Sequence, residues 1–393
     1  FSTQAELRLQ NIFGLQTYNS VRVLDWLSSM PEVDPQRVAI TGASGGGTQT
    51  MILSAIDPRI AVSFPAVMVS TSMQGGCTCE NACLLRVGTG NIEFAGLFAP
   101  KPLGMTGADD WTREIATKGL PELEHLYGLF DAEDRVMAAD FVQFEHNYNY
   151  VSRAAMYQWL NQHLQLGWDE PVVEEDYLPL TVEEMKVWND DHPMPPGGPD
   201  FERQLMRQLA DRTNEEMAER TMLDEASLND FREVAGDAFR VLLDQQDASK
   251  RRVTQRQINA VDRDDHRIGK HVVANHRTHS SLPAITFEPP SPRDHLVILL
   301  HGQGKQTFLA PNALANTVQR LVDHGASVVV ADLFMQGEFT RQGLASIINR
   351  KVENPRDYAG FTYGYNRSLF AERVDDVLTL SSLSSRDGRS FSH

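Results

Sequence analysis

A glycine-rich segment early in the chain has the residue types of a nucleophilic turn. Gly42-Ala43-Ser44-Gly45-Gly46 fits the pattern Gly-x-Ser-x-Gly, between a predicted strand at residues 37–41 and a predicted helix at residues 48–55. Such a turn cramps the backbone of its serine, so the neighbouring residues must lack bulk, as these three glycines do. We therefore expect Ser44 Oγ to project above a sheet, with the Gly45 N–H forming half of an oxyanion hole.

Two other interpretations of this turn stay open. The segment is also similar to the dinucleotide-binding turn of short-chain dehydrogenases, although that pattern needs glycine where Thr48 stands. The dehydrogenase pattern further needs a tyrosine followed four residues later by lysine, and none of the nine tyrosines has that partner. The second alternative is a glycine turn with a purely structural role.

A nucleophilic serine needs a base and an acid, which are expected in the chain order serine, acid, histidine. Asp109 and Asp110 directly follow a predicted strand at residues 102–107. We predict that Asp110 is the acid, with Asp109 in reserve, and a solvated pair of turn aspartates is the alternative. His146 follows the last predicted strand of this region, so we predict that it takes the serine proton and returns it to the leaving group.

Alternating helices and strands are predicted to position these residues. The predicted strands are residues 37–41, 60–67, 102–107 and 140–145, and the predicted helices are 16–29, 48–55, 121–129 and 151–164. Strands separated by helices indicate a mostly parallel sheet covered by helices on both faces. Residues 1–165 are therefore predicted to have an α/β fold.

The middle of the chain differs in charge. The whole chain has 36 Lys and Arg against 53 Asp and Glu, a net charge of −17, which argues against nucleic-acid binding. Residues 166–235 alone hold 19 acidic and 6 basic residues, so about −13 of that charge lies there. We predict that residues 166–282 form an acidic helical connector, and an acidic surface for a cationic partner is the alternative. No run of about 18 apolar residues, the length of a transmembrane segment, occurs in the chain.

Residues 283–393 return to the alternating pattern. A predicted strand at 295–300 ends at His301-Gly302, and a helix at 311–324, a strand at 326–332 and a helix at 367–384 follow. Tyr18-Asn19 and Tyr365-Asn366 each come just before similar helical segments. This repeat suggests the back half of one module followed by the front half of a second, as in a piece of a tandem protein. A circular permutant and a non-catalytic companion domain are the alternatives.

The three cysteines, Cys77, Cys79 and Cys83, crowd into one short segment. They lack the Cys-x-x-Cys pairs and the fourth ligand of a usual zinc site, so no metal is predicted. A local disulfide that leaves one thiol over is the favoured interpretation, and three reduced thiols are the alternative. Cysteine usage thus leans weakly toward a secreted or periplasmic protein.

The residues around the three candidates resemble a known superfamily. Ser44 in GASGGGTQT, Asp110 in GADDWT and His146 in FEHNYNY are similar to the α/β-hydrolases, and within them to acetyl xylan esterases and related carbohydrate esterases. The likeness covers residues 1–165, while residues 283–393 resemble the opening of another such module. In that superfamily a His-Gly turn often supplies the second oxyanion donor, a role the resemblance suggests for His301 and Gly302.

The resemblance implies a serine esterase that works through an acyl-enzyme and needs no metal or organic cofactor. Its implied substrate is an acylated polysaccharide such as acetylated xylan, or another small ester. A non-catalytic carbohydrate-binding or scaffold protein with degenerate hydrolase modules is one alternative. A serine peptidase on the same scaffold is another.

Overall fold

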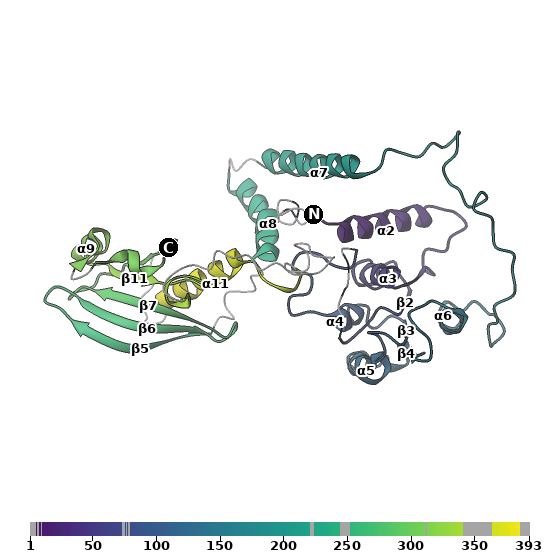
Figure 1. Ribbon diagram of the computed structural model, residues 1–393, viewed down its shortest axis with the longest axis horizontal. Helices are drawn as coiled ribbons and strands as arrows, with labels where there is room; N and C mark the ends of the chain where they lie inside the picture. Colours follow the sequence, from purple (N-terminus) through teal and green to yellow (C-terminus); the bar gives the residue numbers. More distant parts are fainter. Residues whose placement is uncertain are drawn as a thin grey trace. The chain divides into compact units, whose positions relative to one another are not determined.

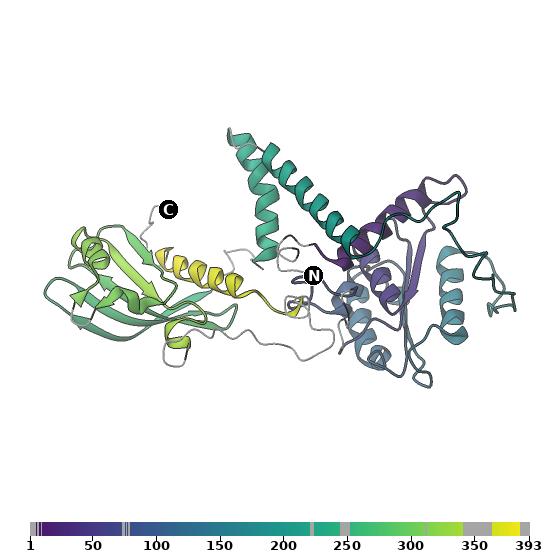
Figure 2. The ribbon, with the colours of Figure 1, turned by 45° about the horizontal axis from the view of Figure 1, so that its top comes forward.

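A computed structural model describes residues 5, 8, 10–72, 75, 77, 79–220, 224–243, 252–310, 313–340 and 364–385. The chain forms two compact units (Figures 1 and 2). The first comprises Phe1–Glu219 with Tyr358–Asn366, and the second comprises Arg220–Asp357 with Arg367–His393.

The first unit contains a four-stranded sheet whose strands follow one another in space as in sequence. The strands are β1 (Ala39–Ala43), β2 (Val62–Ala66), β3 (Leu103–Gly107) and β4 (Val136–Asp140), and all neighbouring pairs are parallel. Every residue of β2 and β3 is buried, as expected for central strands of a parallel sheet that is covered on both faces. The predicted α/β class is confirmed.

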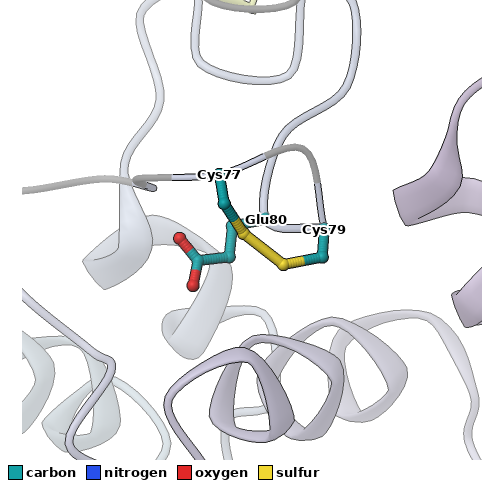
Figure 3. A group of neighbouring side chains, drawn as sticks. All are labelled: Cys77, Cys79 and Glu80. Atoms are coloured by element: carbon teal, nitrogen blue, oxygen red, sulfur yellow. A yellow bond between two sulfur atoms is a disulfide. The ribbon is translucent and has the colours of Figure 1, made fainter. Parts of the chain in front are cut away.

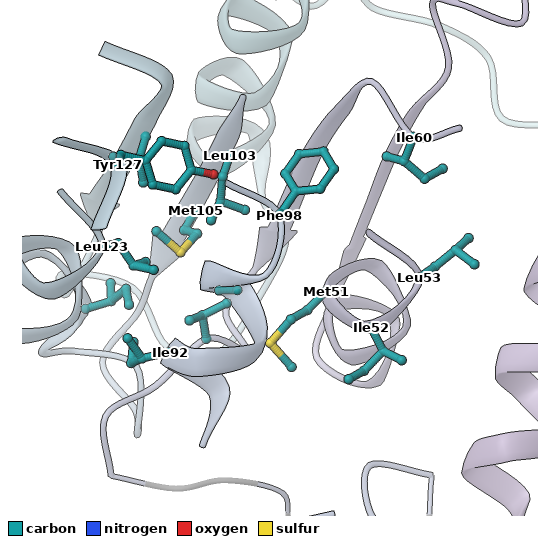
Figure 4. Packing of buried hydrophobic residues seen from close by; sticks show 14 of the residues in the cluster. Met51, Ile52, Leu53, Ile60, Ile92, Phe98, Leu103, Met105, Leu123 and Tyr127 are labelled. Atoms are coloured by element: carbon teal, nitrogen blue, oxygen red, sulfur yellow. The ribbon is translucent and has the colours of Figure 1, made fainter. Parts of the chain in front are cut away.

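Helices cover both faces of this sheet. The helices are α2 (Ile12–Ser28), α3 (Gly45–Ile56), α4 (Asn91–Gly96), α5 (Leu120–Gly128) and α6 (Tyr150–Leu164). Leu103 and Met105 face the cluster formed with α3, α4 and α5, whose packing Figure 4 shows. Phe64 and Val62 face α6, where they pack against Trp159. Because successive strand residues point to opposite faces, the two clusters are separated by the sheet itself.

The last strand of this sheet differs from its prediction. β4 is Val136–Asp140, whereas the sequence predicted a strand at residues 140–145. The apolar residues of 141–145 instead lie in a tight turn, in which the Phe141 N–H donates to the Gly107 carbonyl and the Asp109 N–H donates to the Phe144 carbonyl. Phe141 and Phe144 are half-buried by this turn, which explains why their apolar character was mistaken for a strand.

The predicted acidic connector is wrong in its second half. Helices α7 (Pro199–Glu219) and α8 (Glu225–Leu242) occupy its middle, but residues 253–275 form two antiparallel strands. The first of these, β5 (Val253–Asp262), is an edge strand with mainly exposed polar residues, so it lacks the alternating apolar pattern that marks a strand in sequence. Residues 166–198 contain no helix or strand, although Thr181 and Glu184 exchange the hydrogen bonds of a capping box.

The second unit is built on a five-stranded mixed sheet in the order β5-β6-β7-β11-β8. Its remaining strands are β6 (Arg267–Asn275), β7 (Ser280–Glu288), β8 (Leu296–Leu299) and β11 (Ser327–Ala331), with a small ladder of β9 (Leu309–Ala310) and β10 (Ala313–Leu314). Helices α9 (Asn316–Asp323) and α11 (Leu369–Ser381) pack on it. β8 and β11 lie within the strands predicted at residues 295–300 and 326–332, and the two strands pair in parallel.

Single helical turns complete the described secondary structure: Ile115–Gly119, Glu133–Arg135, Lys305–Phe308, Gly337–Phe339 and Ser382–Ser385. Among the described residues, no helix combines the length and the apolar character that a membrane span requires.

Candidate active site

Ser44 occupies a sharp turn between β1 and α3. Its backbone angles are φ 57° and ψ −123°, a region that side-chain-bearing residues rarely adopt and that costs of order 1–3 kcal/mol. Two backbone hydrogen bonds hold the turn: the Ser44 N–H donates to the Ala66 carbonyl (3.2 Å), and the Ser44 carbonyl accepts from the Thr48 N–H (3.0 Å). Strain held in this way is typical of residues kept for a functional reason.

The glycines around Ser44 have different structural roles. A Cβ at Gly42 would lie 2.7 Å from the backbone of Gly46, so the strand can meet the helix only if residue 42 lacks a side chain. A Cβ at Gly47 would lie 2.7 Å from Met68 Cβ. By contrast, a Cβ at Gly46 would meet nothing within 4 Å, so that position faces open space. Close backbone approach therefore explains Gly42 and Gly47.

Asp110 and His146 form a short hydrogen bond between Asp110 Oδ2 and His146 Nδ1, at 2.6 Å. The side chain of Asp110 is 7% exposed and that of His146 is 33% exposed. The second carboxylate oxygen, Oδ1, accepts from the backbone N–H (2.6 Å) and the hydroxyl (2.5 Å) of Thr112. Three donors thus fix the orientation of the carboxylate of Asp110.

Asp109 has a different environment. Its side chain is 53% exposed and forms an ion pair with Arg113, four residues further on. Its backbone N–H donates to the Phe144 carbonyl, which anchors the loop that carries the histidine. The structure therefore brings Asp110, and not Asp109, into contact with His146.

The loop after β4 returns across the end of the sheet towards β1. The Tyr148 hydroxyl lies 2.5 Å from Thr41 Oγ1, and Thr41 in turn donates to the Phe64 carbonyl on β2. Burial raises the pKa of Tyr148, so its hydroxyl stays protonated as a donor over a wide pH range. Since all four strands are parallel, Ser44 and His146 both follow the carboxyl ends of strands at the same edge of the sheet.

Trp111 packs its ring against the imidazole of His146, with ring centroids 4.7 Å apart and an interplanar angle of 34°. Its carbonyl accepts from the hydroxyl of Ser70 (2.6 Å), which ties the tryptophan to the segment after β2. Sequence reasoning missed this residue, as well as Thr112 and Tyr148. The available signal was their closeness in sequence to the predicted site: Trp111 and Thr112 are the two residues after Asp110, and Tyr148 lies two residues after His146.

The Gly45 N–H is the first of α3, and the first N–H groups of a helix have no acceptor within that helix. This N–H is thus available to an oxygen beside Ser44. His301 and Gly302 follow β8 in the second unit, where His301 Nδ1 accepts from the Gln303 N–H (3.2 Å) and lies 3.0 Å from Thr307 Oγ1.

A disulfide joins Cys77 and Cys79, and Cys83 is not part of it. Figure 3 shows the pair beside Glu80, and the two sulfurs and a Glu80 carboxylate oxygen lie within 4.8 Å of one another. Sulfurs joined in a disulfide cannot act as the thiolate ligands that a metal site would need. The Cys79 sulfur also lies near the nucleophilic turn, 3.8 Å from where a Gly45 Cβ would be.

A comparison with protein families places the first part of the chain beside known esterases. Residues 5–70 match the model of the acetyl xylan esterase (AXE1) family. The predicted resemblance to acetyl xylan esterases is thereby confirmed over the segment that contains Ser44. A search of curated proteins gives no match.

Solved structures similar to this chain include the methylesterase BT1017, with 32% sequence identity over 39% of this chain and 36% of that chain, and a TM-score of 0.37. A family 15 glucuronoyl esterase from Caldicellulosiruptor kristjansonii is 15% identical over 46% of this chain and 57% of its own, with a TM-score of 0.33. A recombinant glucuronoyl esterase from Sporotrichum thermophile is 16% identical over 47% of this chain and 60% of its own, with a TM-score of 0.31. The chain thus spans between a third and two thirds of the length of these structures.

Proposed function

We propose that the protein is a serine carboxylester hydrolase in which Ser44, His146 and Asp110 act together. The observation that carries the proposal is the hydrogen bond between Asp110 Oδ2 and His146 Nδ1, at the sheet edge where the strained Ser44 turn lies. A buried carboxylate on Nδ1 favours the tautomer whose Nε2 can accept a proton. That is the arrangement a serine nucleophile requires.

The reaction follows from these positions. Ser44 Oγ attacks the ester carbonyl while His146 Nε2 takes the hydroxyl proton, and Asp110 stabilises the resulting imidazolium. The Gly45 N–H donates to the oxyanion of the tetrahedral intermediate. His146 then protonates the leaving alcohol, which leaves an acyl group on Ser44. Water, deprotonated by the same histidine, releases the acid and restores the serine.

For the substrate we propose an acylated carbohydrate, with acetylated xylan as the specific candidate. The match of residues 5–70 to the acetyl xylan esterase family supports this choice. The charge of the chain also agrees with a neutral or weakly charged substrate, since the acidic excess lies in residues 166–235 and not around the Ser44 turn.

The test is hydrolysis of 4-nitrophenyl acetate and of acetylated xylan by the wild-type chain and by Ser44→Ala. We expect the wild type to cleave both esters and Ser44→Ala to lose activity by at least about 10³-fold, because removing a nucleophile leaves only binding and oxyanion stabilisation. Undiminished activity of Ser44→Ala would refute the assignment. A wild-type chain inactive on every ester would favour the non-catalytic alternative.

A further inference from the structure

A hollow of about 360 Å³ lies between α2 and α3, directly beside the nucleophilic turn. Helix α2 contributes Gln16, Asn19 and Ser20 to its lining, α3 contributes Gly45, Gly46 and Gln49, and Cys79 of the disulfide completes it. Its volume falls within the range of about 300–1,000 Å³ that is typical of small-molecule sites. Gly45 directly follows Ser44 in the chain, so this part of the lining belongs to the start of α3 at the Ser44 turn.

The two glycines keep this hollow open. A Cβ at Gly46 would meet no atom within 4 Å, and a Cβ at Gly45 would meet only the Cys79 sulfur, at 3.8 Å. Neither glycine has a positive φ that would itself require the residue. Their lack of side chains therefore leaves free space above the start of α3, unlike Gly42 and Gly47, which are explained by backbone contact.

The polar side chains around the hollow are amides and a hydroxyl, which are neutral and can both donate and accept hydrogen bonds. Gln16 and Asn19 are exposed and stand three residues apart, so they share one face of α2. Amides and hydroxyls of this kind are complementary to sugar hydroxyls, which also donate and accept. The lining contains no lysine, arginine, aspartate or glutamate among the described residues, so it lacks the charges that would select an ionised ligand.

Gln49 lies on α3 and faces two hydroxyls of α2. Its Oε1 lies 3.2 Å from the Thr17 hydroxyl and 3.5 Å from the Ser20 hydroxyl, but these hydroxyls donate over shorter distances to the Phe13 and Gln16 carbonyls (2.9 and 3.0 Å), so the amide is held only weakly. Its Nε2 is enclosed and has no hydrogen-bond partner within the part of the chain that the structure describes. Because this Nε2 is not accessible to solvent in the structure, a hydroxyl in the hollow can accept from it only after the amide turns towards the hollow, and that contact would satisfy the enclosed N–H.

We propose that this hollow is the subsite for the neutral, hydroxyl-bearing sugar ring that carries the ester, and that Gln49 determines specificity there. The inference rests on the proposed function, because it assigns the sugar a position beside Ser44. Gln16 and Asn19 bind the hydroxyls at the solvent side, and Gln49 donates from the inner wall once its amide has turned towards the sugar.

The experiment compares two substrates, an acetylated xylo-oligosaccharide and 4-nitrophenyl acetate, in three variants. Gln49→Leu removes the amide at similar volume, and the double variant Gln16→Ala with Asn19→Ala removes the two exposed amides. Gln162→Ala is the matched control, since it removes an exposed amide from α6, away from this lining. Circular dichroism and thermal unfolding check that each variant is folded.

We expect Gln49→Leu and the double variant to raise KM for the xylo-oligosaccharide acetate about five- to tenfold, as the loss of one or two hydrogen bonds predicts. The kcat/KM for 4-nitrophenyl acetate should stay within about twofold, because that ester has no sugar to bind. Gln162→Ala should match the wild type on both substrates.

The inference is overturned if both variants leave the KM for the sugar ester unchanged, or if both folded variants lose activity on the two substrates in parallel. Should Gln49→Leu fail to fold, the double variant alone decides between these results. Failure of the proposed function itself has a different outcome, since the wild-type chain would then cleave neither ester.

Discussion

Replacing Asp110 by Asn separates two explanations of how this carboxylate acts. Asp110 Oδ1 accepts two hydrogen bonds from Thr112, so in the variant we expect the amide oxygen to stay with Thr112. The amide nitrogen then faces His146 Nδ1, across a contact that is 2.6 Å in the wild type. Since that nitrogen is a donor, Nδ1 must become the acceptor, and the proton moves to Nε2. The histidine can then no longer accept the proton of Ser44.

The expected loss follows from this geometry. Removing one charge-assisted hydrogen bond costs about 1.5–3 kcal/mol, a factor of roughly 10 to 150 in rate. Holding the wrong tautomer adds to this, and the same change in serine proteases lowers kcat about 10⁴-fold. We therefore expect Asp110→Asn to lower kcat for 4-nitrophenyl acetate by about 10³–10⁴, with the fold intact by circular dichroism.

Asp109→Asn is the matched control, because Asp109 is its exposed neighbour and pairs with Arg113. Exposed ion pairs contribute about 0–1 kcal/mol, so this variant should keep kcat within about threefold of the wild type. An Asp110→Asn enzyme with more than about a tenth of wild-type kcat would refute the role of the carboxylate. So would an Asp109→Asn enzyme that is equally impaired.

Three further changes test other parts of the structure. Trp111→Ala should lower kcat for 4-nitrophenyl acetate about tenfold with little change in KM, since it removes the ring that packs on His146, and Trp111→Phe should restore much of the loss. Gly47→Ala should lower Tm, because the new Cβ would lie 2.7 Å from Met68 Cβ and cost about 1–3 kcal/mol. Gly46→Ala is the control and should leave Tm unchanged, because its Cβ would meet no atom within 4 Å; equal Tm values for the two variants would contradict this. Burial raises the pKa of Asp376 to about 6 in the folded protein, whereas an aspartate in the unfolded chain has a pKa of about 3.9. The folded protein therefore binds this proton more tightly, and its stability should fall as pH rises between these two values. Asp376→Asn should remove that loss and increase the unfolding free energy above pH 6 by about 2–3 kcal/mol, measured by urea denaturation at pH 5 and 7.5; an identical pH dependence in both proteins would be inconsistent with this origin.

The turn at Ser44 could be predicted from sequence because its constraints are local. A strand, three glycines and a helix within a few residues specify the backbone at Ser44, and β1 and α3 lie as expected around it. β2 and β3 were equally predictable, since fully buried parallel strands form continuous apolar runs. In each of these elements local residues and tertiary burial favour the same structure.

The choice between Asp109 and Asp110 depends on non-local geometry. Both residues follow β3, and their spacing from it differs by a single residue. The Phe144 carbonyl accepts from the backbone N–H of Asp109, and Thr112 donates to the side chain of Asp110. Together these two contacts orient the carboxylate of Asp110 towards His146. The contact with Phe144 is non-local and has no sequence signature, whereas Thr112 stands only two residues after Asp110.

Errors in the predicted strands have a similar cause. The turn at residues 141–145 contains two half-buried phenylalanines, Phe141 and Phe144, and its backbone bonds to Gly107 and Asp109, so composition alone suggested a strand. Conversely, β5 is polar because it is an exposed edge strand whose pairing with β6 is made through the backbone. In both cases the position in the sheet, and not the local sequence, determines the structure.

The most direct test of the proposed mechanism is covalent labelling by a fluorophosphonate probe, followed by mass spectrometry of the modified peptide. An activated serine should react, and we predict a single adduct on Ser44 in the wild type, strongly reduced labelling in Asp110→Asn and none in Ser44→Ala. A folded wild-type chain that is not labelled, or that is labelled equally after Ser44→Ala, would contradict the assignment of Ser44 as the nucleophile.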